Sequence, residues 1–496
     1  MLLLLATLAF VVLSFFARVL LVRSISLADW SAFSFGLSLV SVLAAVGTLG
    51  LPSAVARSLP YAESDADRRS ILRTTVLLGT SSAVVASVLL FLFAGPIGRM
   101  VGSSEVTLAL QVFPIAVGCS VVETLLASVF QGFEDVLPNA LYLQVLNPAL
   151  FLAFLVALAI APSGLTFEGA LVAYVGANVA SLVAITVHSV RRIPRSLRVG
   201  PGATPARRRL LRLAAPLFLV GVMGSILGTG DTIVLGAYHN AEVGTYTATL
   251  TLARLLQVGV GASGYIFLPV AAKFLRRSDT ESVRLTYGTV TKWMLLLSLP
   301  LALLFLFVPS ASLGLVYGSE YSSVVVPLQL TTVAAFATAV LGPAAPAQVA
   351  FGDAHLQAFN AVAGAVVDVV VALVLVPPYG YVGAAVAWGS ANLTWTILCL
   401  LELALIRGVH PFERSFVRPL IATAVPAGAL LFLARSVVRL WMLPPIALAV
   451  AGMFLVLVLL TGSVDRGDRL LLEAVEGWLG RPLPWLRRLG RIGRRD

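Results

Sequence analysis

G-A-L-V-A-Y-V-G-A-N, the ten residues from Gly169 to Asn178, returns 214 positions later as G-A-A-V-A-W-G-S-A-N, from Gly383 to Asn392. Six of the ten positions are identical. Two further segments, which begin at Ala28 and Ala241, match at the similar offset of 213. Two matches that nearly share one offset indicate an internal duplication. In a membrane protein, such a duplication is typical of a two-lobed transporter.

The composition indicates that the chain crosses a membrane many times. It is 59% hydrophobic and 11% charged, with a mean hydropathy of +0.98, whereas soluble domains are about one quarter charged. A helix needs about 20 apolar residues to cross the bilayer core. The sequence therefore predicts an all-α polytopic membrane protein of about fourteen transmembrane helices, at 2–22, 31–52, 71–94, 106–130, 140–161, 169–188, 213–235, 243–268, 288–308, 324–346, 357–376, 381–404, 417–434 and 443–461.

The repeat offset pairs helices one to six with helices seven to twelve. Because six is even, both copies cross in the same direction, which predicts two parallel-repeat six-helix bundles around a central cavity. Two C-terminal helices have no counterpart. The expected parts are an N-lobe (1–190), a basic cytoplasmic linker (191–212), a C-lobe (213–406), helices thirteen and fourteen (407–462) and an amphipathic cytoplasmic tail (463–496).

The positive charges predict the orientation, because Lys and Arg in short loops are retained on the cytoplasmic side. With both termini inside, 27 of the 34 basic residues fall in inner loops and the tail. The others are Arg23, Arg99, Arg435 and Arg439 outside, and Arg18, Arg254 and Lys292 within helices. We therefore expect a multi-pass protein of the cell membrane. The net charge of +11 then indicates contact with membrane lipids, not with nucleic acid.

Catalytic motifs are missing from the sequence, which argues against an enzyme. There is no H-E-x-x-H, G-x-S-x-G or P-loop, and the four histidines are scattered. Cys119 and Cys399 lie in apolar helices and suggest neither a disulfide nor a metal site. Gly259, Gly261 and Gly264 spell G-x-G-x-x-G inside an apolar helix, where we expect a packing face. We expect no cofactor and no metal.

Basic residues at membrane depth are costly and usually functional. Arg254 lies about eleven residues into its helix, or some 16 Å deep at roughly 1.5 Å per residue. It is a candidate for anion binding, with a structural ion pair as the alternative. Arg18 is only a few residues from the end of the first helix, so it either faces the cavity or extends to the outer headgroups.

Three acidic residues are candidates for the cavity or for binding a coupling ion. Asp368 lies near the middle of its helix, Glu123 in the inner half and Asp231 about one turn inside the outer end. Each either binds H⁺ or Na⁺ or neutralises Arg254, although the depths of Asp231 and Arg254 differ by roughly 10 Å. Lys292 and Glu402 are near helix ends, where we expect their charges to extend toward water.

The sequence resembles the polysaccharide-unit flippases, of the O-antigen and teichuronic-acid type, of the multidrug/oligosaccharidyl-lipid/polysaccharide exporter superfamily. The resemblance covers essentially the whole chain. Ser31 departs from it, since a glycine is usual there. The motifs that carry it are Arg23 with L-A-D-W-S-A-F-S, D-T-I-V-L-G from Asp231, E-V-G-T-Y from Glu242, Y-G-S-E-Y from Tyr317 and P-P-Y-G-Y-V-G-A-A-V-A from Pro377.

The resemblance implies two six-helix bundles that rock between inward-open and outward-open states. It implies a substrate too: an oligosaccharide on a polyprenyl or dolichyl (pyro)phosphate, moved from the inner to the outer leaflet for surface polysaccharide or glycoprotein glycan assembly. In related flippases, arginines on helices one and eight hold the phosphate, and Arg18 and Arg254 occupy comparable helices. We expect a monomer, and the sequence leaves open whether the membrane potential or a coupling ion, H⁺ or Na⁺, drives transport.

Two other functions remain open at this point. A cation-coupled multidrug antiporter of the same fold is the main alternative, and the buried arginines argue mildly against it. A polytopic glycan polymerase or transferase is the other, but such enzymes need catalytic acids in a large outer loop. The loops of this sequence are too short for that.

Overall fold

The structure is a computed structural model that describes residues 2–162, 164–198, 204–412, 414–435, 437–460 and 468. The described residues are helical with connecting turns, and none of them forms a strand. The first part of the chain contains α1 (Leu2–Ser24), α2 (Leu27–Gly47), α3 (Leu51–Ser58), α4 (Asp65–Val101), α5 (Ser104–Val112), α6 (Pro114–Gly132), a π-helix η2 (Asn139–Leu146), α7 (Asn147–Ile160), α8 (Phe167–Arg192) and α9 (Arg195–Arg198).

The second part continues with α10 (Thr204–Leu256), α11 (Val258–Leu275), α12 (Thr280–Phe307), α13 (Pro309–Tyr317), α14 (Val325–Leu341), α15 (Ala344–Phe351), α16 (Ala354–Tyr379), α17 (Tyr381–Glu402), a second π-helix η4 (Leu403–Arg407), α18 (Arg414–Ala434) and α19 (Leu443–Leu460). Short 3-10 turns occur at Leu59–Tyr61, Ser319–Tyr321 and Leu440–Met442. Among the described residues, thirteen helical stretches are long and apolar enough to cross a membrane.

One of these thirteen stretches, Ala206–Leu256, contains the expected span 213–235 and the first half of the expected span 243–268. Its 51 residues would extend about 77 Å, more than twice the thickness of the bilayer core. The helix is broken at His239, whose φ of −140° and ψ of 60° are not helical. The prediction of an all-α membrane protein with about fourteen spans is therefore confirmed.

The described chain forms two compact units. The N-unit consists of Leu2–Thr247 and Asp368–Ala384, and the C-unit consists of Ala248–Val367 and the described residues from Ala385 onward. The chain passes between the units inside α10, α16 and α17. The predicted boundary between the lobes comes from the sequence repeat, and a division into compact units does not test it. The boundary therefore stays a prediction.

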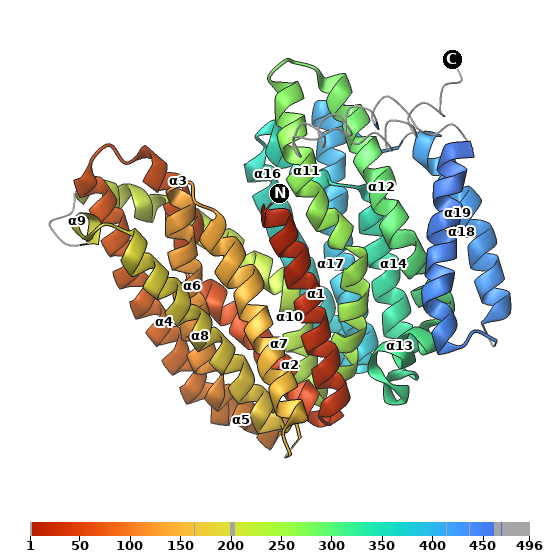
Figure 1. Cartoon of the computed structure of the whole chain (residues 1–496), viewed down its shortest axis with the longest axis horizontal. Coiled ribbons are helices and arrows are strands. Elements are labelled where there is room, and N and C mark those ends of the chain that lie inside the picture. Colours follow the sequence, from red (N-terminus) through yellow and green to blue (C-terminus); the bar gives the residue numbers. More distant parts are fainter. Residues whose placement is uncertain are drawn as a thin grey trace. The chain divides into compact units, whose positions relative to one another are not determined.

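In the N-unit, α4, α5, α6 and α8 pack beside one another, and α1 packs on α7 (Figure 1). An aromatic cluster joins α2, α7, α8 and the junction between α5 and α6. Phe33 of α2 lies 5.4 Å from the ring of Phe113 and 5.9 Å from that of Tyr174, and Phe151 lies 5.3 Å from Tyr174. Tyr174 belongs to the repeated segment. The repeat therefore contributes an aromatic side chain to the core of the N-unit.

The C-unit is built around α12, which packs on α11, α14, α18 and α19 (Figure 1). Most of α12 is buried, including its lysine. Lys292 is 1% exposed and its Nζ lies 2.5 Å from Oδ2 of Asp468, while Trp293 Nε1 donates to Oδ1 at 2.7 Å. The expectation that Lys292 extends to water is wrong, because a buried carboxylate satisfies its charge.

In the second repeat match, corresponding residues of the two copies contact each other directly inside the N-unit. The backbone N–H of Gly244 donates to Ser31 Oγ at 2.9 Å, and Thr247 Oγ1 donates to Ser34 Oγ at 3.2 Å. Both pairs are separated by 213 residues, the repeat offset. Each residue thus bonds to its own copy, as at a local pseudo-twofold axis.

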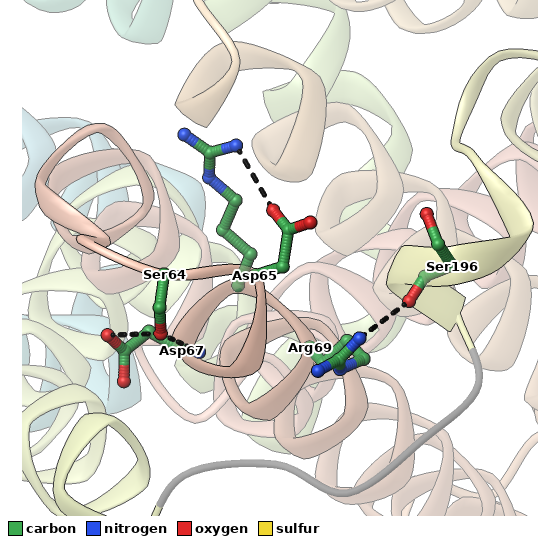
Figure 2. Close-up of polar contacts among 6 residues, drawn as sticks. Ser64, Asp65, Asp67, Arg69 and Ser196 are labelled. Carbon is green, nitrogen blue, oxygen red and sulfur yellow. Dashed lines mark hydrogen bonds and ion pairs between the residues drawn. The ribbon is translucent and has the colours of Figure 1, made fainter.

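The start of α4 shows how the connection to α9 is held (Figure 2). Ser64 caps α4 by accepting from the N–H of Asp67 at 3.1 Å, as Ser commonly does at a helix start. One turn further, Arg69 donates to the carbonyl of Ser196 in α9 at 3.2 Å. Part of the predicted linker is therefore fixed to α4. The predicted amphipathic tail, 463–496, lies outside the described residues except for Asp468.

Candidate functional site

Two of the predicted acids meet in the N-unit. Asp231 of α10 and Asp368 of α16 are completely buried, and Asp368 Oδ2 accepts from the backbone N–H of Asp231 at 3.1 Å. Gly230 makes this approach possible, because a Cβ there would lie 2.7 Å from the same carboxylate oxygen. The acids were predicted separately, and their proximity is a result of the fold.

Tyr246 completes this acid cluster. Its hydroxyl donates to Asp231 Oδ2 in a short hydrogen bond and lies 3.4 Å from the carbonyl of Ala384. Asp368 Oδ1 is buried and has no hydrogen-bond partner among the described residues. Two buried carboxylates repel each other when both are ionised, so a shared cation would stabilise them. The cluster offers carboxylate, hydroxyl and carbonyl oxygens to such a cation.

Polar contacts next to the acid cluster stabilise the helix break at His239. His239 Nε2 lies 3.1 Å from the carbonyl of Pro377, and Glu242 accepts from the N–H of Tyr381 at 2.7 Å. Gly380 between these helices has a φ of +52°, and a Cβ there would clash with the Glu242 carboxylate. The P-P-Y-G-Y motif, where α16 ends and α17 begins, is therefore bonded to α10 at its break.

A second polar cluster of the N-unit contains the other predicted acid. Glu123 of α6 is 3% exposed, the side chains of Asn147 and Ser181 face it, and its Oε1 has no partner among the described residues. Arg18 is half-buried, and both it and Glu123 lie within electrostatic range of the Tyr174 hydroxyl. The structure thus brings Arg18 and Glu123 near the same aromatic residue, Tyr174. The pair of Asp231 and Asp368 lies on other helices, α10 and α16.

Arg254 lies in the C-unit at the last turn of α10. The helix ends at Leu256, where the N–H of Gln257 donates to the carbonyl of Arg254 at 3.0 Å, and α11 then continues from Val258. Arg254 is half-buried. Its helix therefore bends next to the charge, inside the span 243–268 that was expected to be continuous.

A cavity of about 530 Å³ opens beside this bend, within the C-unit. Gly261 and Gly264 line it, which corrects the expectation of a packing face in part. Gly259 still packs against Met294 and Gly264 against Pro346, whereas Gly261 faces open space. The polar side chains that line the cavity are Gln257, Thr338, Gln357, Asn392, Trp395 and Thr396. No charged side chain of the described residues lines it. A separate apolar cavity of about 440 Å³ lies between α18 and α19.

Glu402, also expected to extend to water, is bonded inside the C-unit. Its Oε2 accepts from Gln348 at 2.5 Å and from Asn360 at 2.6 Å. Sequence reasoning missed Tyr246 and Trp395, although signals for both exist. Tyr246 replaces the Phe33 of its repeat copy, and Trp395 follows Asn392 by three residues on one helix face.

Ionisable groups buried inside an all-helical protein of many spans mark a functional site within a multi-pass membrane protein. This chain belongs to the family of polysaccharide biosynthesis proteins, whose family model matches residues 1–275. No curated protein matches it in sequence. The fold is similar to that of the lipid II flippase MurJ in an inward closed conformation, with a TM-score of 0.72 and 14% identity, over 91% of this chain and 97% of that chain.

The fold is also similar to that of multidrug transporters. An inward-facing multidrug resistance transporter of the MATE family matches with a TM-score of 0.65 and 14% identity, over 79% of this chain and 93% of that one. The eukaryotic MATE transporter AtDTX14 matches with a TM-score of 0.53 and 13% identity, over 81% and 93%. The chain therefore has the fold shared by flippases and MATE transporters.

Proposed function

We propose that the protein is a flippase that moves a polyprenyl- or dolichyl-(pyro)phosphate-linked oligosaccharide from the inner to the outer leaflet by alternating access. The observation that carries this proposal is Arg254, a half-buried cation at a helix bend beside an uncharged polar cavity, in a chain of the polysaccharide biosynthesis family. A cation and neutral hydrogen-bonding groups match a phosphate followed by sugars. Arg18 is the second proposed phosphate contact.

The proposed driving force is electrical, with an ion as a second contribution. Moving an anionic headgroup outward across an inside-negative membrane is favourable by about 2.3 kcal/mol per charge per 100 mV. The buried pair of Asp231 and Asp368 is the proposed site for H⁺ or Na⁺, and Glu123 is the remaining candidate. The apolar cavity between α18 and α19 suits a hydrocarbon chain.

Export of surface glycan tests the role of Arg254. In a strain that lacks its own flippase and carries this protein, we expect Arg254→Ala to abolish surface glycan while membrane insertion remains normal. Arg254→Lys should retain part of the export, because it keeps the charge but not the bidentate geometry. The control is Arg435→Ala, which removes an exposed arginine. Undiminished export by Arg254→Ala would remove this residue from the mechanism.

The multidrug antiporter is the second function to be tested, since the buried acid pair and the similarity to MATE transporters favour it. An antiporter would lower the accumulation of a cationic dye in cells that lack their own exporters. A flippase would leave dye accumulation unchanged and restore glycan. Dye extrusion without glycan export would replace the proposed function with the alternative.

A further inference from the structure

We propose that the uncharged cavity of the C-unit is a subsite for one sugar ring of the transported lipid, next to the phosphate contact at Arg254. This inference rests on the proposed function and adds to it the chemistry of the cavity. The cavity lies within one unit and has a volume of about 530 Å³, inside the range of about 300–1,000 Å³ found for small-molecule pockets.

The side chains of the cavity suit hydroxyl groups. Asn392, Trp395, Thr396 and Cys399 line it from one face of α17, at the spacing i, i+3, i+4 and i+7. Gln257 and Gln357 contribute amides from other segments, and an amide side chain both donates and accepts. A ring with several hydroxyl groups matches this set of donors and acceptors.

Among the residues that line the cavity, Trp395 gives the strongest indication that a ligand binds there. Its Nε1 is buried and has no hydrogen-bond partner among the described residues, although buried indole N–H groups usually have one. Leaving such a donor unpaired costs about as much as a lost hydrogen bond. The Nε1 atom is closed to solvent in this conformation, so a hydroxyl oxygen of a bound sugar would satisfy the N–H once the indole turns toward the cavity. An apolar ligand would leave it unpaired.

The charge of the cavity restricts the ligand further. None of the described residues that line it is charged, so a cationic drug or a second phosphate would find no counter-charge there. Gly261 has open space where its Cβ would be, and the wall of α11 is therefore flat at that point. The site fits an uncharged ring better than a charged group.

The other repeat shows that the cavity is not a general feature of the scaffold. Asn178, the repeat copy of Asn392, accepts from Ser120 and from Asn147, both at 3.3 Å. Asn178 and Asn392 each also donate to the carbonyl four positions earlier in their own helix, at 2.8 Å and 2.9 Å respectively. The N-unit therefore fills this place with interhelical amide bonds, whereas the C-unit leaves it open. Only one copy is available to a ligand.

The position of the cavity beside Arg254 indicates which sugar of the transported lipid it would hold. Gln257 follows Arg254 by three residues, about 4.5 Å along a helix, and its backbone N–H bonds to the Arg254 carbonyl. A phosphate at Arg254 would therefore place the adjoining sugar at the part of the cavity that Gln257 lines. The cavity then receives the sugar attached to the phosphate, whichever sugars follow it.

Binding to two matched lipids tests the subsite. The probes are a short polyprenyl pyrophosphate and the same lipid carrying one N-acetylhexosamine, and affinities are measured on the purified full-length protein in nanodiscs. We expect Trp395→Phe and Gln257→Leu each to weaken binding of the sugar-bearing lipid about fivefold, the effect of one hydrogen bond, and to leave the bare lipid unaffected. Arg254→Ala should weaken both lipids.

Trp388→Phe is the matched control, because Trp388 is buried on the same helix but does not line the cavity. Unchanged affinity for the bare lipid shows that a variant is folded. If the wild type binds both lipids equally, or if Trp395→Phe and Gln257→Leu leave the sugar-bearing lipid unaffected, the subsite is overturned and the proposed function stands. If the wild type binds neither lipid, the proposed function fails together with the inference.

Discussion

Asp231 and Asp368 occupy one buried place in the N-unit although 137 residues separate them. Their environment contains the Tyr246 hydroxyl and backbone groups. Two carboxylates in such proximity repel each other when both are ionised, and a cation between them would relieve the repulsion. We therefore propose that this pair responds to the ionic conditions.

Sodium-dependent thermal stability tests the acid pair. If the pair binds Na⁺, sodium chloride raises the unfolding midpoint of the purified wild type relative to choline chloride, since ligand at a hundred times its Kd stabilises by about 2.7 kcal/mol. Lowering the pH weakens this response, because protonated carboxylates do not bind Na⁺. We expect Asp368→Asn to abolish the response. Glu123→Gln is the matched control, and loss of the response in that variant alone would place the ion at Glu123.

Sequence reasoning could identify buried charges but not their partners. A charge in an apolar helix is visible from the sequence alone, which is why Arg254, Asp231 and Asp368 were recognised as candidates. Which charges meet depends on helix rotation and packing, which periodicity does not determine. Lys292 shows the limit, because its partner Asp468 lies 176 residues away in a stretch with no motif.

At the scale of the element, small residues decide how closely α2 and α10 approach. Gly244 lies against Ser31 and Trp30, and a Cβ at position 244 would be 2.7 Å from Ser31 Oγ. The Trp30 Nε1 donates to the Gly244 carbonyl at 3.0 Å, so the helices touch through backbone atoms. Glycine is needed here for contact, since the residue lies within a helix.

Two glycine substitutions in α10 should have opposite effects. Gly244→Ala forces its Cβ against Ser31 and Trp30, and overpacking of this kind costs about 1–3 kcal/mol. Gly221→Ala enters open space and gains roughly 0.5–1 kcal/mol from its higher helix propensity. We expect the midpoint of thermal aggregation in detergent to fall for Gly244→Ala and to hold or rise for Gly221→Ala. Equal midpoints would contradict the close contact.

The helices themselves were largely predictable, whereas of the interruptions at His239 and after Arg254 only the first was. Apolar length alone placed the spans, since about 20 residues are needed to cross the bilayer. The break at His239 falls in the connection expected between the spans 213–235 and 243–268. The bend after Arg254 has no proline and lies inside the span 243–268, which was expected to be continuous. Contacts between helices, such as His239 with Pro377, stabilise these interruptions.

At the scale of the whole molecule, the proposed orientation with both termini in the cytoplasm rests on the distribution of arginine. Labelling of single cysteines tests it, because Cys119 and Cys399 are buried and give a low background. We expect a membrane-impermeant maleimide to label Arg435→Cys in intact cells, and to label Glu63→Cys only after permeabilisation. The reverse pattern would invert the topology.

The fold class followed from the sequence because the repeat and the apolar runs are properties of the whole chain. The candidate site followed only in part. Arg254 and its depth were predicted, whereas the cavity beside it needs α11, α14, α15, α16 and α17 in place. The G-x-G-x-x-G segment shows why: small residues in a helix either pack or leave space, and the neighbouring helices decide which.

The bonds from Ser31 to Gly244 and from Ser34 to Thr247 have an evolutionary consequence. Two identical protomers that meet on a twofold axis bring each residue to its own equivalent. Fusion of duplicated genes keeps such a contact inside one polypeptide, where the two positions become free to differ. Ser31 beside Gly244 is such a divergence: one copy carries a hydroxyl while the other has no side chain, and a change at either position affects the fit of its own duplicate.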